Sequence, residues 1–376
     1  MSKLVMVDSL VDNDYAICLC NALKEEKQDV SLVVTENRRI ASEVDFVVER
    51  MAPTKERGIS KLKKLGKYFQ YLLQLRRYAA RNDALAIHFQ FFRRERLDSF
   101  YFALLRLLGY NVVHTAHNVL PHERGCIDFY LKYLVYLSAS RLIVHSDYIR
   151  NKLLATFNIN PSKVFVVPHG NFDMYIPDKP PTIQEARQNL ELPQNATIAL
   201  CFGHIREYKG IDALISAFEI AAKDNSDLYL VVAGSARTEA LKKRYADQIA
   251  NSAVSDRIRY RPEFIPNEAV ADYLTSADII TLPYRAIDHS GIVHLAYSFG
   301  KPVLATRVGD FDEAIEHGKS GMIVDPDNVD VLAKELLDMS KSKSSLKEMG
   351  EYARMLNETK YSWQDIARKT IAVYKS

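Results

Sequence analysis

Residues 198–212 read Ile-Ala-Leu-Cys-Phe-Gly-His-Ile-Arg-Glu-Tyr-Lys-Gly-Ile-Asp. The apolar opening is typical of a buried strand that ends at Gly203, and an amphipathic helix is expected after Gly210. The short loop between them presents Arg206 and Lys209. Two cations beside a helix start suit a diphosphate, because positive side chains and free backbone N–H groups converge there. Taken alone, the two cations also fit solvated loop residues.

A second strand, loop and helix is expected at residues 281–306. They read Thr-Leu-Pro-Tyr-Arg-Ala-Ile-Asp-His-Ser-Gly-Ile-Val-His-Leu-Ala-Tyr-Ser-Phe-Gly-Lys-Pro-Val-Leu-Ala-Thr. Ser290 and Gly291 lie at the expected helix start, where N–H groups lack intrahelical partners and the helix dipole is positive. Two such starts at the carboxyl ends of neighbouring strands predict one anion-binding cleft. Neither a Walker A sequence nor Gly-x-Gly-x-x-Gly is present, which argues against P-loop and dinucleotide sites.

The same alternation of short β-branched runs with longer helical periods extends along the whole chain. It is the pattern of β/α units around parallel sheets. We expect strands at residues 4–8, 30–35, 84–90, 111–117, 141–145 and 163–168, then at 197–203, 227–234, 257–264, 278–284, 302–306 and 322–325. Four prolines among polar residues between 170 and 195 mark a connection between the two series. A chain of 376 residues has room for two such domains.

The last segment of the chain predicts an amphipathic helix. Its apolar residues fall at helical spacing: Trp363, Ile366, Ala367, Ile371 and Tyr374. We therefore predict an α/β protein with two Rossmann-like β/α/β domains facing each other across a cleft. They would span residues 1–170 and 171–357, and residues 358–376 would cross back to pack on the N-terminal domain.

Cysteine spacing and hydropathy indicate the cellular compartment of the protein. Cys18, Cys20, Cys126 and Cys201 lack the two-residue spacing of a zinc or redox motif, so they read as core thiols of a reducing compartment. The apolar stretch at the N-terminus is too short for a signal peptide, and no run of about 18 uncharged apolar residues occurs. We expect a cytoplasmic protein without a membrane span.

Positive charge is concentrated between Arg50 and Arg106, where 14 Lys or Arg residues stand against four acidic residues. Aromatic and apolar residues are interleaved with them: Tyr68, Phe69, Tyr71, Leu72, Phe89, Phe91 and Phe92. One interpretation is a peripheral contact with anionic lipid at the inner face of a membrane. The other is solvated faces of amphipathic helices whose aromatic residues point into the core. The sequence leaves both open.

Five motifs in order carry a family resemblance. They are Val166-Val-Pro-His-Gly-Asn; Gly203-His-Ile-Arg-Glu-Tyr-Lys-Gly; Ala277-Asp-Ile-Ile-Thr-Leu-Pro-Tyr; Ser290-Gly-Ile-Val-His-Leu-Ala-Tyr-Ser-Phe-Gly-Lys-Pro-Val; and Val308-Gly-Asp-Phe-Asp-Glu followed by Gly318-Lys-Ser-Gly-Met-Ile-Val. From about Pro168 to its end, the chain resembles the retaining glycosyltransferases of family 4, also called group 1. The resemblance implies the GT-B architecture, with an acceptor-binding N-terminal domain and a nucleotide-sugar-binding C-terminal domain.

The resemblance also implies roles for single residues. Arg206 and Lys209 would hold the donor phosphates, and the N–H groups of Ser290, Gly291 and Ile292 would take the distal phosphate. Further donor contacts are implied for Gly203, His204, His289 and Glu313, and acceptor-side contacts for Asn13 and Tyr15.

In the first half, Val113-His-Thr-Ala-His-Asn resembles the family strand that brings a histidine to the transferred sugar. His117 takes that place, unless it is a packed histidine at a strand end. Many family members also carry two Glu separated by seven residues, but counting back from Gly300 puts Ile287 and Leu295 there. Asp288 or His289 is the expected substitute at the sugar, although Asp288 also suits a helix cap before Ser290.

The activity implied by the resemblance is transfer of a hexose from GDP-mannose or a UDP-hexose to a glycan or lipid-linked acceptor, in cell-surface or exopolysaccharide synthesis. Fixed cations and helix starts stabilise the charge of the leaving diphosphate. We therefore expect no metal, no cofactor and no nucleic-acid partner. Two rivals stay open: a GT-B enzyme of the nucleotide-sugar epimerase kind, and a non-catalytic nucleotide-sugar-binding protein.

Overall fold

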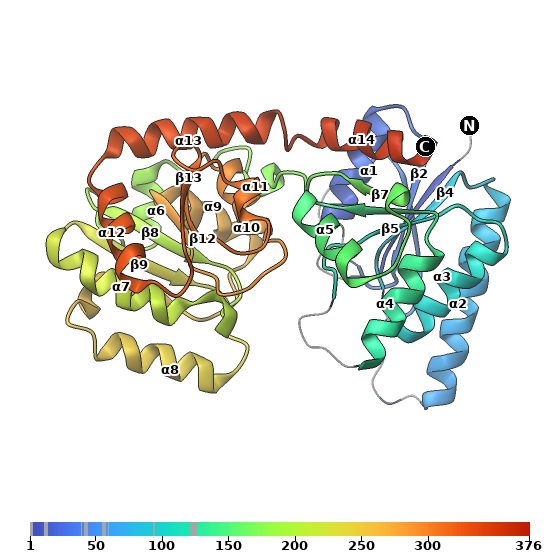
Figure 1. The fold of residues 1–376 in the computed structure, drawn as a ribbon, viewed down its shortest axis with the longest axis horizontal. Helices are drawn as coiled ribbons and strands as arrows, with labels where there is room; N and C mark the ends of the chain where they lie inside the picture. Colours follow the sequence, from blue (N-terminus) through green and yellow to red (C-terminus); the bar gives the residue numbers. More distant parts are fainter. Residues whose placement is uncertain are drawn as a thin grey trace. The chain divides into compact units, whose positions relative to one another are not determined.

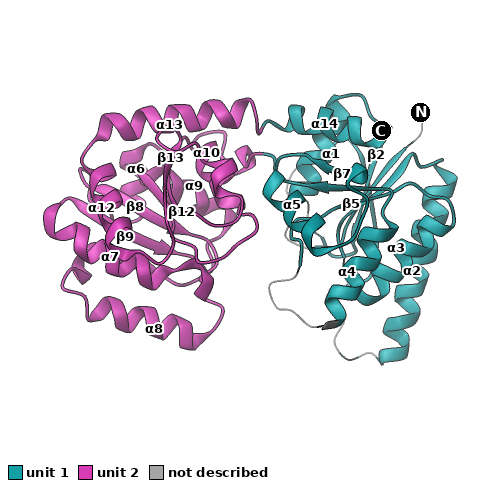
Figure 2. Ribbon diagram, in the orientation of Figure 1, with its two compact units in different colours: residues 1–170, 362–376 teal, residues 171–361 magenta. Residues whose placement is uncertain are grey.

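The computed structural model describes residues 3–10, 14–38, 40, 44–54, 58, 60–92, 95–120 and 126–376 (Figure 1). The chain forms two compact units (Figure 2): unit 1 comprises residues 1–170 and 362–376, and unit 2 comprises residues 171–361. The second boundary lies at 361/362 and not at 357/358. The reason is that the N–H groups of Thr359 and Tyr361 still bond the carbonyls of Met355 and Leu356 in the helix that closes unit 2.

Unit 1 is built on a seven-stranded parallel sheet in the order β3-β2-β1-β4-β5-β6-β7. Its strands are β1 (Leu4–Asp8), β2 (Val30–Thr35), β3 (Val47–Ala52), β4 (Ala86–Phe91), β5 (Val112–Thr115), β6 (Arg141–Val144) and β7 (Val164–Val166). Its helices are α1 (Tyr15–Glu25), α2 (Lys61–Arg81), α3 (Glu95–Leu107), α4 (Cys126–Ser138), α5 (Asp147–Thr156), the short η1 (Pro161–Lys163) and α14 (Trp363–Lys375).

Helices cover both faces of this sheet. On one face α1 and the C-terminal α14 pack together over side chains such as Leu4, Met6 and Leu32. On the other face α2 to α5 pack over the alternate residues Val5 and Val7. This alternation follows from the strand period of two. The predicted packing of a C-terminal helix on the N-terminal domain is therefore confirmed.

Unit 2 repeats the plan with a six-stranded parallel sheet in the order β10-β9-β8-β11-β12-β13. Its strands are β8 (Thr197–Phe202), β9 (Leu228–Ala233), β10 (Ile258–Arg261), β11 (Ile279–Leu282), β12 (Val303–Thr306) and β13 (Gly321–Val324). Its helices are η2 (Asp173–Tyr175), α6 (Ile183–Asn189), η3 (Glu207–Lys209), α7 (Ile211–Asp224), α8 (Glu239–Ala250), η4 (Ser255–Arg257), α9 (Asn267–Ser276), α10 (Gly291–Ser298), α11 (Phe311–Ala314), α12 (Val329–Ser340) and α13 (Lys343–Glu358).

The prediction of two Rossmann-like domains is confirmed, and each predicted strand segment contains a strand. In both sheets the strand order reverses beside the first strand of the unit, which is the point where such folds bind ligands at the carboxyl ends of the strands. The edge strand β3 was not predicted, because it is only partly buried and carries Glu49 and Arg50. No helix in the described parts of the chain is both long and apolar enough to cross a bilayer.

Candidate functional site

The loop after β8 carries two cations, Arg206 and Lys209. Lys209 is only 6% exposed, and its burial lowers the pKa of the ammonium group, which the charge of Arg206 lowers further. Within the described residues, neither side chain forms a hydrogen bond or a salt bridge. The Lys209 Nζ instead lies 5.2 Å from the centroid of the Tyr284 ring. Because a buried charge is costly without a partner, this loop is poised to hold an anion.

Gly210 joins this loop to the loop after β11. Its left-handed backbone (φ 65°) caps α7, and a Cβ atom there would overlap the carbonyl oxygen of Pro283. The backbone N–H of Arg285 also donates to the carbonyl of Tyr208 at 2.7 Å. Only glycine permits this approach, so the two predicted loops are held against each other at the carboxyl edge of the sheet.

The start of α10 meets Lys209 at Gly203. A Cβ atom on Gly203 would lie 3.2 Å from the Lys209 Nζ and 3.3 Å from Cδ1 of Ile292. Ser290 is the N-cap of α10, and its side chain makes no capping hydrogen bond. The first N–H groups of a helix have no intrahelical acceptor, so those of Gly291 and Ile292 remain available to an anion. The structure thus brings these predicted donor residues together in unit 2.

A pocket of about 280 Å³ opens beside this meeting point. Gly203, His204, Gly291 and Ile292 line it together with a largely apolar set: Phe172, Tyr175, Phe202, Phe264, Ile265, Val270 and Leu295. Phe264 is 71% exposed. His204 bonds Ser235 Oγ at 2.7 Å, and partial burial, Lys209 and Arg206 lower the pKa of its imidazole. The pocket suits a flat heteroaromatic ring, and no sequence motif had indicated Phe172 or Phe264.

The loop before α10 is anchored to the loop before α11. Nδ1 of His289 lies 2.7 Å from Oδ2 of Asp310, and the Asp310 N–H donates to the Asp288 carbonyl at 3.2 Å. A Cβ atom on Gly309 would lie 2.9 Å from that same carbonyl oxygen. Asp288 is 8% exposed and lies two residues before the N-cap Ser290. The N-cap position proposed as its alternative role thus belongs to Ser290.

Glu313 lies in α11, and its side chain is exposed. Its carbonyl accepts a hydrogen bond from the Lys360 Nζ at 3.0 Å. Leu295, at the place of the second family Glu, is buried and lines the apolar pocket. A carboxylate is thus absent from that position, and a role for Glu313 at the donor stays a prediction.

In unit 1, His117 follows β5 and lines a pocket of about 210 Å³ with Gln90, Phe92, His114 and Lys132. Its ring stacks on Phe91, with centroids 4.3 Å apart and planes at 9°. The imidazole is therefore packed against Phe91 and also lines a pocket. This geometry is compatible with both interpretations of the sequence, a packed strand-end histidine and a histidine that contacts the sugar.

Both nitrogens of His117 are held. Nε2 lies 3.0 Å from the Gln90 Oε1, and Nδ1 lies 2.9 Å from Nε2 of His145. Nδ1 of His145 in turn faces the carbonyl of Val167 at 3.1 Å, so that nitrogen carries a proton. Gln90 and His145 were missed by sequence reasoning, although both stand at or just after the ends of strands.

The chain of hydrogen bonds continues to the C-terminal helix. Gln90 Nε2 lies 3.3 Å from Nε2 of His88, which is 2.7 Å from the Thr115 hydroxyl. Nδ1 of His88 lies 2.7 Å from the hydroxyl of Tyr374 in α14. Burial lowers the pKa of His88 to about 3, so this imidazole is neutral at physiological pH. The orientation of His117 therefore depends on residues as distant in sequence as Tyr374.

The two acceptor-side predictions fall in the segment after β1. Tyr15 is 4% exposed and packs edge-on against His117 and Trp363, with centroid distances of 5.0 and 5.1 Å. Burial raises the pKa of its phenol. Tyr15 thus supports the imidazole through packing, and direct contact with an acceptor stays a prediction. Asn13 lies outside the described residues.

Part of the apolar set in the basic stretch lies in the core. Tyr68, Tyr71, Leu72 and Phe89 are buried, as the second interpretation of that stretch expected. On α2, however, three apolar side chains are exposed at i, i+7 and i+11: Leu62 (81%), Phe69 (53%) and Leu73 (50%). These positions share one helix face.

Comparison with known families gives two matches that divide the chain as its units do. The family model described as Glycosyltransferase Family 4 matches residues 13–170, and Glycosyl transferases group 1 matches residues 182–356. D-inositol 3-phosphate glycosyltransferase of Corynebacterium urealyticum is 26% identical over 245 residues, which cover 64% of this chain and 57% of that protein. The enzyme of the same name from Streptomyces bingchenggensis is 30% identical over 63% of this chain and 53% of its own length. The chain thus matches little more than half of these curated relatives.

Solved structures resemble the whole chain. Sucrose-phosphate synthase from Thermosynechococcus elongatus matches with a TM-score of 0.80 and 18% identity, over 100% of this chain and 98% of the other. HepE of Anabaena, solved in complex with UDP and glucose, matches with a TM-score of 0.78 and 16% identity over 100% of both chains. At such identities the likeness concerns the fold alone. With both family models matched in order, the chain belongs to the group 1, family 4 glycosyltransferases and has their GT-B fold.

Proposed function

We propose that this protein transfers a hexose from a nucleoside diphosphate sugar, GDP-mannose or a UDP-hexose, to a glycan or lipid-linked acceptor in cell-surface or exopolysaccharide synthesis. The observation that carries the proposal is the buried ammonium of Lys209. It lies beside Arg206 and the start of α10, with no carboxylate bonded to it among the residues described. A diphosphate supplies the missing charge, and the complexes of HepE with UDP and UDP-glucose support a nucleotide donor.

We propose one orientation for the donor in unit 2. The base enters the apolar pocket beside Gly203, and the phosphates bind Arg206, Lys209 and the N–H groups of Ser290, Gly291 and Ile292. The sugar then extends toward the loop that carries Asp288 and His289. On unit 1 we assign His117 to the transferred sugar, since its ring is fixed and still lines a pocket.

The reaction breaks the bond between the anomeric carbon and the distal phosphate and forms one from that carbon to an acceptor hydroxyl. Negative charge grows on the leaving diphosphate, where Lys209 and the α10 start stabilise it more in the transition state than in the ground state. We propose that the leaving phosphate oxygen takes the acceptor proton on the same face, which gives retention. These residues provide the stabilisation without a metal.

A panel of nucleotide sugars tests the proposal. Donors that bind the folded protein should raise its melting temperature, and this rise should be lost in Lys209→Ala. Transfer to glycan or lipid-linked acceptors is then followed by the anomeric signal of the product in proton NMR. A panel in which GDP and UDP sugars neither bind nor react would sink the proposal, and an inverted product would sink retention.

One observation favours a second candidate, an epimerase-like reaction on the donor sugar. His289 is oriented by Asp310 at 2.7 Å, as a general base would be. Such an enzyme alters the donor without an acceptor, so incubation with nucleotide sugar alone distinguishes the two. A changed sugar in that incubation would favour the second candidate, and an unchanged one would favour transfer.

We also propose that the protein is cytoplasmic and touches anionic membrane peripherally through residues 50–106. The support is the apolar row of Leu62, Phe69 and Leu73 on α2, which is accompanied by exposed cations such as Lys63 and Arg76. Exposed apolar residues next to basic ones are the pattern of an interfacial helix.

A further inference from the structure

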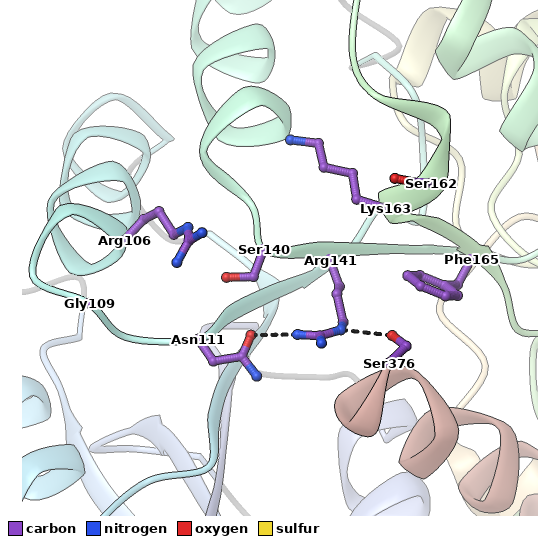
Figure 3. A pocket seen from close by; sticks show the side chains of 9 residues that line it. All are labelled: Arg106, Gly109, Asn111, Ser140, Arg141, Ser162, Lys163, Phe165 and Ser376. Carbon is purple, nitrogen blue, oxygen red and sulfur yellow. Dashed lines mark hydrogen bonds between the residues drawn. The ribbon is translucent and has the colours of Figure 1, made fainter.

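Unit 1 has a second hollow, of about 480 Å³, where β5, β6 and β7 begin. It lies at the opposite edge of the sheet from His117, which follows the end of β5. Its polar lining comes from the end of α3, the starts of the strands, η1 and the end of α14: Arg106, Ser140, Arg141, Ser162, Lys163 and Ser376 (Figure 3). Ligands of this fold usually bind at the carboxyl edge, so neither the family nor the proposed donor site accounts for this hollow.

Three cations face the hollow, and none of its lining side chains is acidic. Figure 3 shows Arg106 and Lys163 directed toward the same space. Arg141 is held by Asn111 Oδ1 at 3.0 Å and Ser376 Oγ at 2.8 Å. Lys163 donates to the carbonyls of Leu137 and Ala139 at 2.8 and 3.3 Å. Two of the three cations are thus fixed in place by neutral partners.

Arg106 differs from the other two cations. Its side chain is exposed and makes no hydrogen bond or salt bridge within the part of the chain that the structure describes. All its guanidinium donors are therefore available. Burial lowers the pKa of Lys163, and the positive charge of Arg106 lowers it further. Like charges thus lie near one another in a hollow lined by no acidic side chain, and an anion there would relieve the repulsion.

We infer that this hollow binds a phosphate group. The planar fork of Arg106 matches two phosphate oxygens, while Lys163, whose charge Arg106 influences, keeps an unused N–H for another. The hydroxyls of Ser140 and Ser162 can donate as well. A phosphomonoester carries close to two negative charges at neutral pH, so it suits three cations better than a single carboxylate does.

The phosphate has two sources with the same chemistry: a soluble phosphomonoester, or the headgroup of an anionic lipid. Leu107 and Leu108 follow Arg106 directly and are 84% and 47% exposed, and Leu137, whose carbonyl binds Lys163, is 55% exposed. Acyl chains could contact these side chains while the headgroup occupies the hollow. A soluble ligand would leave them in water. The two sources therefore differ in their dependence on a bilayer.

The test compares Arg106→Gln with Arg96→Gln. Both arginines are exposed on α3 and lose the same charge, but only Arg106 lines the hollow. Neither side chain has a partner in the described structure, so neither substitution removes an internal contact. Both variants are made in the full chain carrying Lys209→Ala, so that the proposed donor site does not contribute phosphate binding. If the donor proposal is wrong, the comparison between the two arginines still stands.

Calorimetric titration with sn-glycerol 3-phosphate and inorganic phosphate forms one arm, and sedimentation with phosphatidylglycerol or phosphatidylcholine vesicles forms the other. We expect Arg106→Gln to weaken binding at least tenfold in one arm, while Arg96→Gln changes it less than twofold. An effect in the first arm identifies a soluble phosphate, and an effect confined to phosphatidylglycerol vesicles identifies a lipid headgroup. Equal behaviour of the two variants in both arms, or no binding in either, would overturn the inference.

Discussion

Replacing Lys209 by Met tests the central feature of the proposed donor site. The side chain is 6% exposed and has no hydrogen-bonding partner in the described structure, so only the Tyr284 ring offsets the desolvation of the ammonium until an anion binds. Methionine fills a similar volume without charge. The variant should therefore fold with a melting temperature equal to or higher than that of the wild type, because a buried charge is replaced by an apolar group.

The same substitution should strongly weaken nucleotide binding. A unit charge about 4 Å from the ammonium interacts with it by about 4 kcal/mol at an effective dielectric of about 20. After desolvation, a hydrogen bond to a charged group retains about 1.5–3 kcal/mol. At about 1.4 kcal/mol per tenfold, affinity for UDP or GDP should fall between about tenfold and a hundredfold. The loss in kcat/KM should be at least as large, because charge on the diphosphate grows in the transition state.

The assay is thermal unfolding with and without UDP or GDP, followed by transfer kinetics. Lys301→Met is the matched control, since Lys301 is a second largely buried lysine of unit 2 whose Nζ bonds the carbonyls of Thr275 and Ala277. It should keep the nucleotide-induced shift that Lys209→Met loses. If Lys209→Met lowered the melting temperature yet kept that shift, Lys209 would be a structural residue and the reasoning would be refuted.

Four further predictions concern other parts of the molecule. Asp288→Asn should reduce transfer at least tenfold with an unchanged melting temperature if the carboxylate binds the sugar; unchanged kinetics would reject that role. Because burial lowers the pKa of Lys301 to about 8, the folded protein binds fewer protons than the unfolded chain between about pH 8 and 10. The free energy of unfolding of the wild type, minus that of Lys301→Met, should thus rise by up to about 3 kcal/mol between these pH values in urea titrations. A difference that does not change with pH would contradict this prediction. Phe69→Ser should weaken sedimentation with phosphatidylglycerol vesicles in a salt-dependent manner, whereas insensitivity to both substitution and salt counts against the α2 surface. Tyr374→Phe should cost about 1–2 kcal/mol in chemical unfolding, because it leaves buried His88 without one partner; an unaltered midpoint would show that this hydrogen bond is unimportant.

Strand positions and domain number followed from the sequence because parallel strands buried on both faces appear as continuous apolar runs. The edge strand β3 was not predicted, for the opposite reason. Val47 at its start is 46% exposed, and Glu49 and Arg50 interrupt its apolar pattern. Local pattern therefore locates the elements that the core requires and overlooks those that a neighbouring strand alone stabilises.

The meeting of the two proposed donor loops at one edge of the sheet was predictable because their chemistry is local. Lys209, Gly210 and Ser290 stand at fixed distances from strand ends and helix starts, so spacing alone brings cations and free N–H groups to one edge. The surroundings of His117 could not be predicted from the sequence, because Gln90 and His145, which hold its ring, belong to other strands. Such contacts depend on strand order, and a strand-end polar residue becomes informative only when its neighbouring strand is known.

The absence of the family's Glu pair and the absence of a carboxylate bonded to Lys209 among the described residues have the same effect. Both reduce the negative charge near the Lys209 ammonium. Ile287 and Leu295 occupy the two family positions, and Leu295 adds to the apolar wall of the pocket beside Gly203. The nearest carboxylate on that loop, Asp288, is fixed through its own carbonyl to Asp310, while the carboxylate of Asp310 is engaged by His289. Neither carboxylate is bonded to Lys209, so the lysine keeps its full attraction for phosphate.

A site arranged in this way obtains its affinity from the diphosphate rather than from the ribose, and it should discriminate weakly between nucleosides while depending strongly on the second phosphate. Binding of UDP should therefore exceed that of UMP by far more than it differs from that of GDP, and calorimetry showing the reverse order would contradict this account.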